Sequence, residues 1–552
     1  MKRFVSAARG EKAGAAVSKI IFASVFAAFV LLPLVRMLLY IDGRSLHEVF
    51  SAPYFKEAVV NSLTSGVTAS LISLLLAYFL AVCLSRVDIR LKSLFSVIFI
   101  LPMLIPSISH GMGLLLILGN NGLVTRLLHL DFSIYGFWGI VAGSVMYTFP
   151  VAFLMFSDIL KYEDYSPYEA AKVLGVSAPR RFASITLPYL RRPLISIVFT
   201  VFTMIITDYG VPLIIGGKFK TLSSVMYQEA IGRLNFDNGA VLGAVLLVPA
   251  VIAFVFDLLN RDKGNMSFVT RPFVLSKSRG ARAAAYGFCT LVSLLVMIPL
   301  ICFVLIGFAK RYPTDLSFTL KNIQKTFTMD AGKYLANSVI IALWVSVLGM
   351  GISFFAAYLT ARMKSGLSRL LHLICITTAA IPGIVLGLSY AIVFNQSFIY
   401  NTLIILVVVN LVHFIASPYM MMYNSFSKLN ENLEAVGKTM GVGRLRMLRD
   451  VFLPQSLSTV LEVGSYFFVN CMMTISAVSF LGSSSAVKPV ALMINQFEAQ
   501  MQLECAAVVS LMILLVNMLL KLLIFAVKKQ MARRGLKKAQ KARSTYAYKK
   551  TV

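Results

Sequence analysis

Long apolar stretches recur along the whole chain, and short polar segments separate them. Twelve of these stretches are long enough to cross the hydrocarbon core of a bilayer as helices. They cover residues 18–40, 60–84, 94–118, 135–160, 193–216, 239–259, 283–309, 336–361, 370–394, 399–425, 457–482 and 503–527. The pattern therefore predicts an all-α polytopic membrane protein with about 12 transmembrane helices. The first stretch is too long for a signal-peptide core, so we expect it to remain as an anchor.

The second half of the chain repeats features of the first. Asn61-Ser62 opens the second stretch and Arg86 closes it, and Asn337-Ser338 and Arg362 do the same for the eighth stretch, 276 residues later. We expect two homologous six-helix repeats, a cytoplasmic linker between them and a basic cytoplasmic tail, at residues 1–260, 283–528, 261–282 and 529–552. An even number of spans separates equivalent positions, so the repeats are parallel and relate by an axis along the membrane normal.

Prolines lie inside several apolar stretches, among them Pro106, Pro150, Pro382 and Pro418. Each removes an intrahelical hydrogen bond, so we expect each to kink its helix. Ile105-Pro106 and Ile381-Pro382 again lie 276 residues apart.

A polar segment, residues 161–192, separates the fourth and fifth stretches. Ser166 and Glu169 have the spacing of a capping box, and Pro167 suits the first position of a helix. Gly175 can take the left-handed conformation that ends a helix, and Pro188 stands where the chain re-enters the membrane. Residues 427–456 repeat this helix, turn, helix pattern, with Gly441 and Pro454 at the same spacing as Gly175 and Pro188.

Both segments resemble the EAA loop, E-A-A-x-x-x-G-x9-I-x-L-P, of the permease subunits of bacterial ABC importers. The first copy matches in full, at Glu169, Ala170, Ala171, Gly175 and Pro188. The second copy is degenerate, because counting back from Gly441 puts Ala435 at the glutamate position and Glu434 one residue early; its other candidate residues are Gly437 and Pro454.

This resemblance implies the type I ABC importer permease fold, with both loops acting as coupling helices. It also implies two ABC ATPase subunits at the cytoplasmic loops and a substrate-binding protein at the outer face. Because the second copy lacks the acid in register, we expect Glu169→Ala to reduce transport and ATPase association more than Glu434→Ala.

The 52 Lys and Arg residues outnumber the 23 Asp and Glu residues and give a net charge of +29. Most of the basic residues lie on the side of the two EAA-like loops, whereas the acidic residues divide almost evenly, which is the positive-inside pattern. We therefore expect a multi-pass protein of the bacterial cytoplasmic (inner) membrane with both termini in the cytoplasm. The bilayer rather than nucleic acid explains the charge, and residues 528–552 are expected to lie disordered against its anionic leaflet.

The sequence contains no catalytic constellation, and we expect no cofactor and no metal site. Gly437-Lys438-Thr439 resembles the end of a phosphate-binding loop, but Asn432 replaces the first glycine. The chain is therefore expected to be a transport subunit that depends on separate ATPase subunits. The six cysteines form no C-x-x-C pair and are interpreted as small core residues.

Two carboxylates, Asp208 and Glu462, lie inside apolar stretches, where a charge normally faces a bundle interior or a water-filled cavity. The segment from Asp208 and Tyr209 to Pro212 resembles a D-[FY]-G-x-P stretch of ferric-iron importer permeases, as residues 473–478 resemble its counterpart in their second half. That resemblance implies that Asp208 and Tyr209 line the translocation pathway; His110, a lone histidine in an apolar helix, is a further candidate.

Several alternatives remain open at this point. Ferric iron is the leading substrate, but phosphonate (2-aminoethylphosphonate) and polyamine permeases are similar. Asp208 is alternatively a helix-end carboxylate exposed to water at the outer face, and Glu462 is expected to pair with a loop arginine such as Arg444. The rival class is an ion-coupled secondary transporter, which requires paired ionisable residues near the bilayer midplane.

Overall fold

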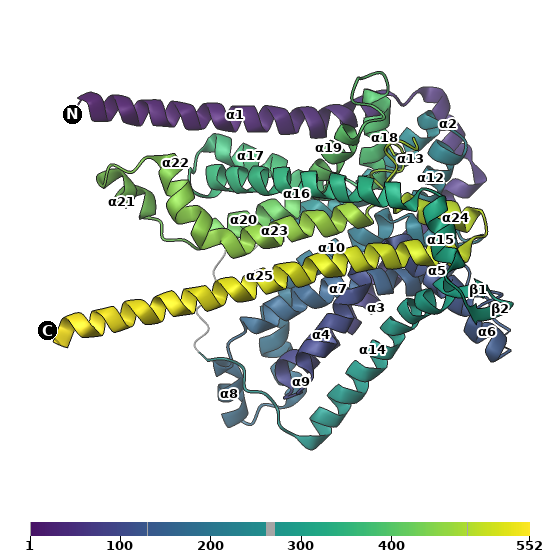
Figure 1. Cartoon of the computed structure of the whole chain (residues 1–552), viewed down its shortest axis with the longest axis horizontal. Helices are drawn as coiled ribbons and strands as arrows, with labels where there is room; N and C mark the ends of the chain where they lie inside the picture. Colours follow the sequence, from purple (N-terminus) through teal and green to yellow (C-terminus); the bar gives the residue numbers. More distant parts are fainter. Residues whose placement is uncertain (1, 130, 261–270, 483, 552) are drawn as a thin grey trace.

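The computed structural model describes residues 2–129, 131–260, 271–482 and 484–551, and these residues are mostly helical (Figure 1). The first repeat contains α1 (Lys2–Leu39), α2 (Gly43–Ser51), α3 (Pro53–Arg86), α4 (Lys92–Ile100), α5 (Ser107–Leu118), α6 (Leu123–Leu127), α7 (Phe137–Lys161), α8 (Ser166–Val173), α9 (Ala178–Arg181), α10 (Leu187–Thr207), α11 (Gly210–Ile215), α12 (Leu222–Tyr227) and α13 (Phe236–Asn260). The linker prediction falls partly on residues 261–270, which lie outside the described residues.

The second repeat follows a similar order, with a small antiparallel hairpin added after its first helix. It contains α14 (Arg279–Gly307), β1 (Ala309–Arg311), β2 (Asp315–Phe318), α15 (Lys321–Thr328), α16 (Ala331–Ala361), α17 (Gly366–Thr377), α18 (Gly383–Phe394), α19 (Leu403–Phe414), α20 (Ala416–Ser427), α21 (Leu433–Thr439), α22 (Arg444–Met447), α23 (Leu453–Met473), α24 (Leu492–Ala499) and α25 (Leu503–Thr551). Short 3-10 turns lie at Leu101–Leu104 and Thr378–Ala380, and π turns at Phe182–Thr186, Gln228–Gly232 and Leu448–Phe452.

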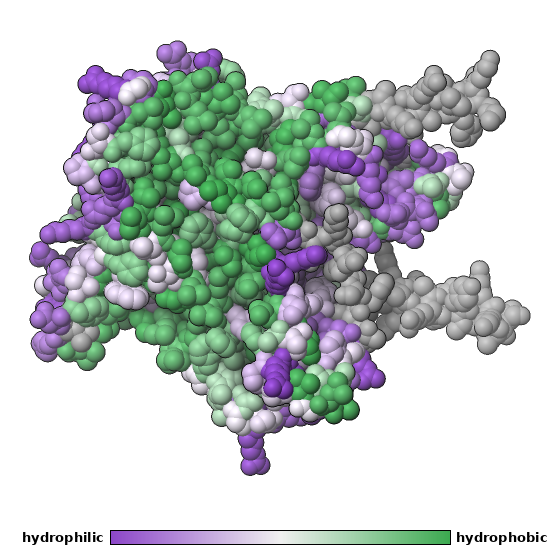
Figure 2. Space-filling model, turned by 180° about the vertical axis from the view of Figure 1, so that it is seen from behind, coloured by the Kyte–Doolittle hydropathy of each residue, from purple (hydrophilic) through white to green (hydrophobic). Residues whose placement is uncertain are grey.

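Within the described residues, eight helices are long and apolar enough to cross a membrane, or up to eleven if each bent pair counts as one span. Figure 2 shows a broad hydrophobic surface with hydrophilic residues gathered at its two ends, as a bilayer requires. The all-α polytopic fold is thus confirmed. Of the twelve predicted stretches, 457–482 is the one outside these candidate spans; it falls on α23, where polar residues such as Gln455, Glu462 and Asn470 lower the hydropathy.

Prolines mark the sharpest bends. The chain turns by 102° between the α4 and α5 segments at Pro106, and by 105° between α17 and α18 at Pro382. A bend of 54° separates α19 from α20, just before Pro418. The expected kink at Pro150 is not a break, because α7 continues through it.

The first helix of each repeat packs against helices of the other repeat. α1 packs against α17 and α18, and α14 packs against α4 and α5 (Figure 1). Lys19 of α1 donates to the carbonyl oxygen of Met363 at 2.6 Å, which anchors α1 at the end of α16. The two repeats are therefore interlocked through exchanged helices.

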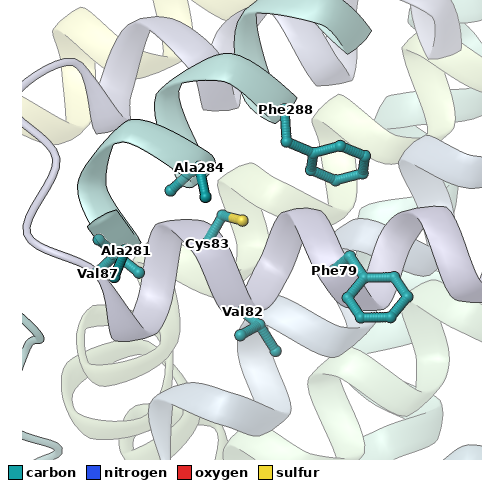
Figure 3. A pocket seen from close by; sticks show the side chains of 8 residues that line it. Phe79, Val82, Cys83, Val87, Ala281, Ala284 and Phe288 are labelled. Carbon is teal, nitrogen blue, oxygen red and sulfur yellow. The ribbon is translucent and has the colours of Figure 1, made fainter. Parts of the chain in front are cut away.

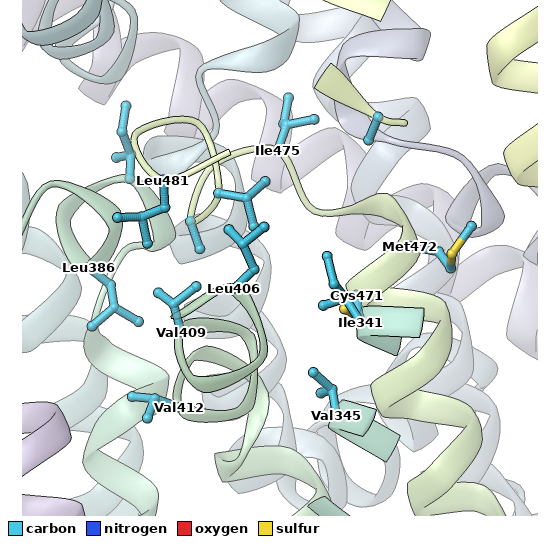
Figure 4. Packing of buried hydrophobic residues seen from close by; sticks show 14 of the residues in the cluster. Ile341, Val345, Leu386, Leu406, Val409, Val412, Cys471, Met472, Ile475 and Leu481 are labelled. Carbon is cyan, nitrogen blue, oxygen red and sulfur yellow. The ribbon is translucent and has the colours of Figure 1, made fainter. Parts of the chain in front are cut away.

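The buried core of the second repeat is formed between α16, α19 and α23. Figure 4 shows Ile341 and Val345 of α16, Val409 of α19 and Cys471 of α23 in this apolar interior. Five of the six cysteines are buried in such surroundings and Cys83 is half-buried.

The prediction of a disordered tail is wrong for the backbone. α25 leaves the membrane span, whose apolar window ends at Arg534, and continues to Thr551. Residues 528–551 contain many Ala, Lys, Arg and Gln residues, one glycine and no proline, so their intrinsic preference is helical.

Candidate functional site: two helical hairpins and the interior segment at Asp208

The two EAA-like loops lie at one end of the molecule, which we call the hairpin end (Figure 1). The opposite end, which carries α2, α12, α15 and α24, is called the loop end. At the hairpin end, α8 and α21 each begin a hairpin whose second arm runs back into the membrane as α10 or α23.

The two turns have the same backbone geometry. Gly175 and Gly441 both have φ of +70°. The N–H groups of Gly175 and Val176 donate to the carbonyls of Lys172 and Ala171 at 3.1 and 2.9 Å, and Gly441 and Val442 donate to Lys438 and Gly437 at 3.1 and 2.8 Å. These paired bonds form a Schellman motif, in which a glycine removes the steric penalty of positive φ.

The return arms also match. A π turn at Phe182–Thr186 precedes Pro188, and a π turn at Leu448–Phe452 precedes Pro454. Pro188 and Pro454 thus lie in the first turns of α10 and α23 rather than at a break. An extra residue in the preceding turn accommodates a proline ring that would clash with a regular helix.

The predicted capping box at α8 is wrong. Ser166 is the first residue of the helix, and its N–H and hydroxyl both donate to Oδ1 of Asp164, at 3.1 and 3.0 Å. Asp164 therefore takes the acceptor role that we assigned to Ser166. Glu169 instead forms a 2.5 Å ion pair with Arg271, and its side chain is 41% exposed.

Arg271 belongs to a segment, residues 271–276, that lies within the predicted linker and runs along the first hairpin. We call this segment the strap. Its Arg271 N–H donates to Asp164 at 3.1 Å, and its Arg271 carbonyl accepts from Tyr165 N–H at 3.1 Å. Phe273 packs edge-on against the stacked rings of Tyr165 and Tyr168, with the Arg86 guanidinium 3.4 Å above its centre.

The repeated arginines at the ends of α3 and α16 bind acidic residues of the two hairpins. Arg86 forms a buried ion pair with Glu163, whose other oxygen accepts from the Tyr168 hydroxyl. Arg362 pairs with Glu434 at 2.5 Å and also donates to the carbonyls of Leu429 and Asn430 at 2.9 and 2.7 Å. Hydrogen bonding to Glu434 raises the pKa of the Arg362 guanidinium, against the opposing effect of burial.

Ala171 and Gly437 are the hairpin residues with packing roles. Ala171 is buried on α8, whereas Ala170 on α8 and Ala435 on α21 are exposed. A Cβ atom on Gly437 would lie 2.2 Å from Sδ of Met447, so only glycine permits the close contact of α21 with α22.

Asp208 lies where α10 ends and α11 begins, inside the helical bundle. Its carboxylate accepts from the Ser107 hydroxyl at 2.5 Å and from the N–H groups of Gly210 and Val211 at 3.3 and 3.0 Å. The alternative of a water-exposed helix end is wrong, because these groups hold the half-buried carboxylate over the first turn of α11.

Tyr209 and His110 are also interior residues. The buried Tyr209 ring stacks on Tyr227 with centroids 4.5 Å apart, and its hydroxyl lies 2.5 Å from that of Ser479 in the other repeat. The His110 ring is buried 5.9 Å from that of Tyr147. Tyr209 thus joins the two repeats, a role that its position in the sequence did not reveal.

Glu462 has a different partner from the predicted one. It pairs with Lys528 of α25 and not with Arg444. Asp208 and Glu462 therefore form separate interactions and are not the midplane pair that an ion-coupled transporter requires.

Two further kinds of site, a metal site and a ligand cavity, find little support in the described residues. Across the described ranges, His, Cys, Asp and Glu do not gather into a group of three that could hold a metal ion. A cavity of about 320 Å³ between α3 and α14 is lined only by apolar side chains and Cys83, among them Phe79, Val82 and Phe288 (Figure 3).

Comparison with known proteins identifies the repeats. The family described as "Binding-protein-dependent transport system inner membrane component" matches residues 73–261 and 349–533. The chain is 25% identical to the ferric transport system permease protein FbpB of Actinobacillus pleuropneumoniae over 82% of this chain and 68% of that protein. It is 24% identical to the Fe(3+)-transport system permease protein FbpB 2 of Haemophilus influenzae, over 85% of this chain and 89% of that protein. The molybdenum transport system permease protein ModB of Haemophilus influenzae is 32% identical, but over 31% of this chain and 78% of that protein.

Proposed function

The chain belongs to the family of binding-protein-dependent transport system inner membrane components, and we propose that it is the fused permease of an ATP-driven importer of ferric iron. The observation that carries this proposal is the pair of matched hairpins. In both hairpins the first helix ends at a glycine in the left-handed conformation, with the same two backbone hydrogen bonds. One hairpin lies within each of the two segments that match the family. A pair of equivalent docking helices suits a motor of two equivalent subunits.

Ferric iron is favoured over the alternative cargoes because the relatives named for ferric transport match the larger share of this chain. Relatives named for ferric transport match this chain through both repeats, whereas the molybdenum permease matches about one repeat. Phosphonate and polyamine remain the alternative cargoes, and the uptake assay below discriminates among them.

The permease uses partners for both energy and substrate. We infer that two ATPase subunits dock at α8 and α21 and that a binding protein delivers the cargo at the loop end. The Lys and Arg excess supports an orientation in the bacterial inner membrane in which the hairpin end and both termini face the cytoplasm. Closure of the ATPases rocks the repeats and alternates access.

Within the bundle, Asp208, Tyr209 and His110 are the pathway residues of this proposal. Asp208 and Tyr209 lie at the interior break where the two repeats meet, and His110 lies on α5 beside it. The carboxylate and phenol oxygens are hard ligands of the kind that a ferric ion prefers.

Uptake by the reconstituted complex tests the function. Vesicles containing the chain, its ATPase and its binding protein should take up radiolabelled ferric iron only with ATP, and the chain alone should not hydrolyse ATP. A matched complex with a hydrolysis-defective ATPase is the control. Uptake of a phosphonate or polyamine instead of iron would refute the cargo, and ATP hydrolysis by the isolated chain would refute its role as a transport subunit.

A further inference from the structure

The repeated Asn-Ser pairs lie at the loop ends of two equivalent helices, α3 and α16. Asn61 Nδ2 donates to the carbonyl of Lys220 at 3.0 Å, and Ser62 Oγ accepts from the N–H of Leu222 at 2.8 Å. Both side chains are buried, so water has little access to these bonds. The pair therefore attaches α3 to the segment that follows α11.

The second pair makes the same attachment in the other repeat. Asn337 Nδ2 donates to the carbonyls of Ala486 and Lys488 at 3.0 and 3.3 Å, and Ser338 Oγ accepts from Val490 N–H at 2.8 Å. We call each Asn-Ser pair with its bonds a loop clamp. Two copies with the same donors and acceptors argue that the attachment is a feature of the repeat.

Each loop clamp lies five residues from a contact between the repeats. Leu222 is the first residue of α12 and Tyr227 is the last. The Tyr227 hydroxyl accepts from Nδ2 of Asn495 in α24 at 2.8 Å, and Asn495 follows Val490 as Tyr227 follows Leu222. Equivalent positions of the two repeats therefore meet here, and the Tyr227 ring that accepts from Asn495 also stacks on Tyr209.

The hairpin ends of the same two helices hold the coupling hairpins. Arg86 closes α3 and binds Glu163, and Arg362 follows α16 and binds Glu434. The 25 residues from Asn61 to Arg86 span about 37 Å of helix, which exceeds the ~30 Å hydrocarbon core. Each helix thus contacts a hairpin at one end of the membrane and, at the other, the segment that leads to the inter-repeat contact.

We propose that α3 and α16 connect the coupling hairpins mechanically to the inter-repeat contact of Tyr227 and Asn495, and that the loop clamps are the positioning residues of this connection. The inference rests on the proposed function, because it needs ATPase closure at the hairpins. Residues 216–221, which join α11 to α12, contain no helix, so α12 is positioned by its contact with α3, and the loop clamp supplies the hydrogen bonds of that contact. Without it, the hairpins move while the inter-repeat contact stays in place.

Removal of a loop clamp tests the connection. Asn61→Ala/Ser62→Ala and Asn337→Ala/Ser338→Ala are compared with Ser70→Ala, a control in which the lost hydroxyl bonds within α3, to the carbonyl of Gly66. We expect each double variant to lower cargo transported per ATP hydrolysed at least tenfold while ATP hydrolysis continues. Ser62→Thr and Ser338→Thr keep the hydroxyl and should retain the wild-type ratio.

Spin-label distances separate this effect from simple misfolding. Exposed positions Val173 and Met440 report on the hairpin end, and Leu234 and Met501 on the loop end. In the complex, nucleotide should change both distances in the unmodified chain, but only the hairpin-end distance in the double variants.

A loop-end change of normal size in the double variants, or an unaltered transport ratio, would overturn the inference. If nucleotide changes neither distance in the unmodified chain, the proposed function fails and the inference fails with it.

Discussion

Glu169 forms an exposed ion pair, whereas Glu434 forms an ion pair with a buried arginine. Alanine variants of the two residues should therefore differ in their effects on hairpin stability and on ATPase association. Glu169 pairs with Arg271, and the two side chains are 41% and 63% exposed. Such a surface pair contributes about 0–1 kcal/mol. The strap keeps its other contacts with Asp164, Tyr165 and Tyr168, so Glu169→Ala should leave α8 folded and remove only an outward-facing acid.

Glu434→Ala affects a contact inside the protein. It removes two charge-assisted hydrogen bonds from Arg362, whose side chain is 5% exposed. Breaking a buried pair costs about 3–5 kcal/mol when the remaining charge is uncompensated. The carbonyls of Leu429 and Asn430 still accept from Arg362, which reduces the expected cost to about 2–3 kcal/mol.

Hydrogen exchange converts these free energies into rates. At about 1.4 kcal/mol per tenfold, exchange of the α21 amides should accelerate roughly 30- to 140-fold in Glu434→Ala. Exchange of the α8 amides should accelerate no more than about fivefold in Glu169→Ala. Glu431→Ala is the matched control, because Glu431 forms an exposed pair with Lys364 near the same helix.

Association with the ATPase should show the reverse order. Glu169→Ala should weaken binding and transport more than Glu434→Ala, with both proteins inserted at normal levels. Unchanged exchange of α21 in Glu434→Ala would refute the structural role of the Arg362 pair. A larger loss of ATPase association in Glu434→Ala than in Glu169→Ala would show that Glu434 serves as the docking acid.

Three further predictions concern the hairpins. Gly175→Val should cost about 1–2 kcal/mol, all of it backbone strain at φ +70°, because a Cβ atom at this position would meet no other atom. The variant should lower transport per ATP without lowering membrane insertion, and wild-type transport would contradict this. Gly437→Ala should displace Met447 and speed α21 exchange more than Gly443→Ala, which meets open space; equal exchange in the two variants would argue against tight α21–α22 packing. In a cysteine-free background, Lys172→Cys and Lys438→Cys should resist a membrane-impermeant thiol reagent added to intact cells, whereas the control Leu234→Cys should react; labelling at 172 or 438 would reverse the assigned orientation.

Local backbone requirements were readable from the sequence because few residues satisfy them. The two hairpin glycines are at left-handed positions that side chains rarely adopt, and Pro106 and Pro382 lie at breaks of 102° and 105°. The exchange of α1 and α14 between the repeats was not readable, because apolar helices of similar composition pack equally well on several neighbours. The contacts of Lys19 with Met363 and of Phe29 with Tyr390 and Phe394 identify the partner of α1, and none of them is visible in the sequence.

Charge partners were the least predictable part of the site. Arg362 and Glu434 lie 72 residues apart, and Arg271 and Glu169 lie 102 residues apart. Sequence spacing carries no information about such pairs, which explains why the capping box at Ser166 and the Glu462–Arg444 pair were both wrong. The Asn-Ser repeat was visible from the start, but its partners lie in irregular segments whose position depends on the whole fold.

The two hairpins show which features duplication preserves. Gly175 and Gly441, with their π turns, determine the direction of the chain, and no other residue provides that geometry without strain. An acid is less constrained, because it needs only a cation within reach. In the first hairpin Glu163 neutralises Arg86, which leaves Glu169 at the surface. In the second, Glu434 neutralises Arg362 from within α21 itself, and Ala435 occupies the position equivalent to Glu169. The displaced glutamate of the second copy therefore neutralises the repeated arginine, as Glu163 does in the first copy. An outward-facing acid on the first helix of the hairpin is the feature that α21 lacks.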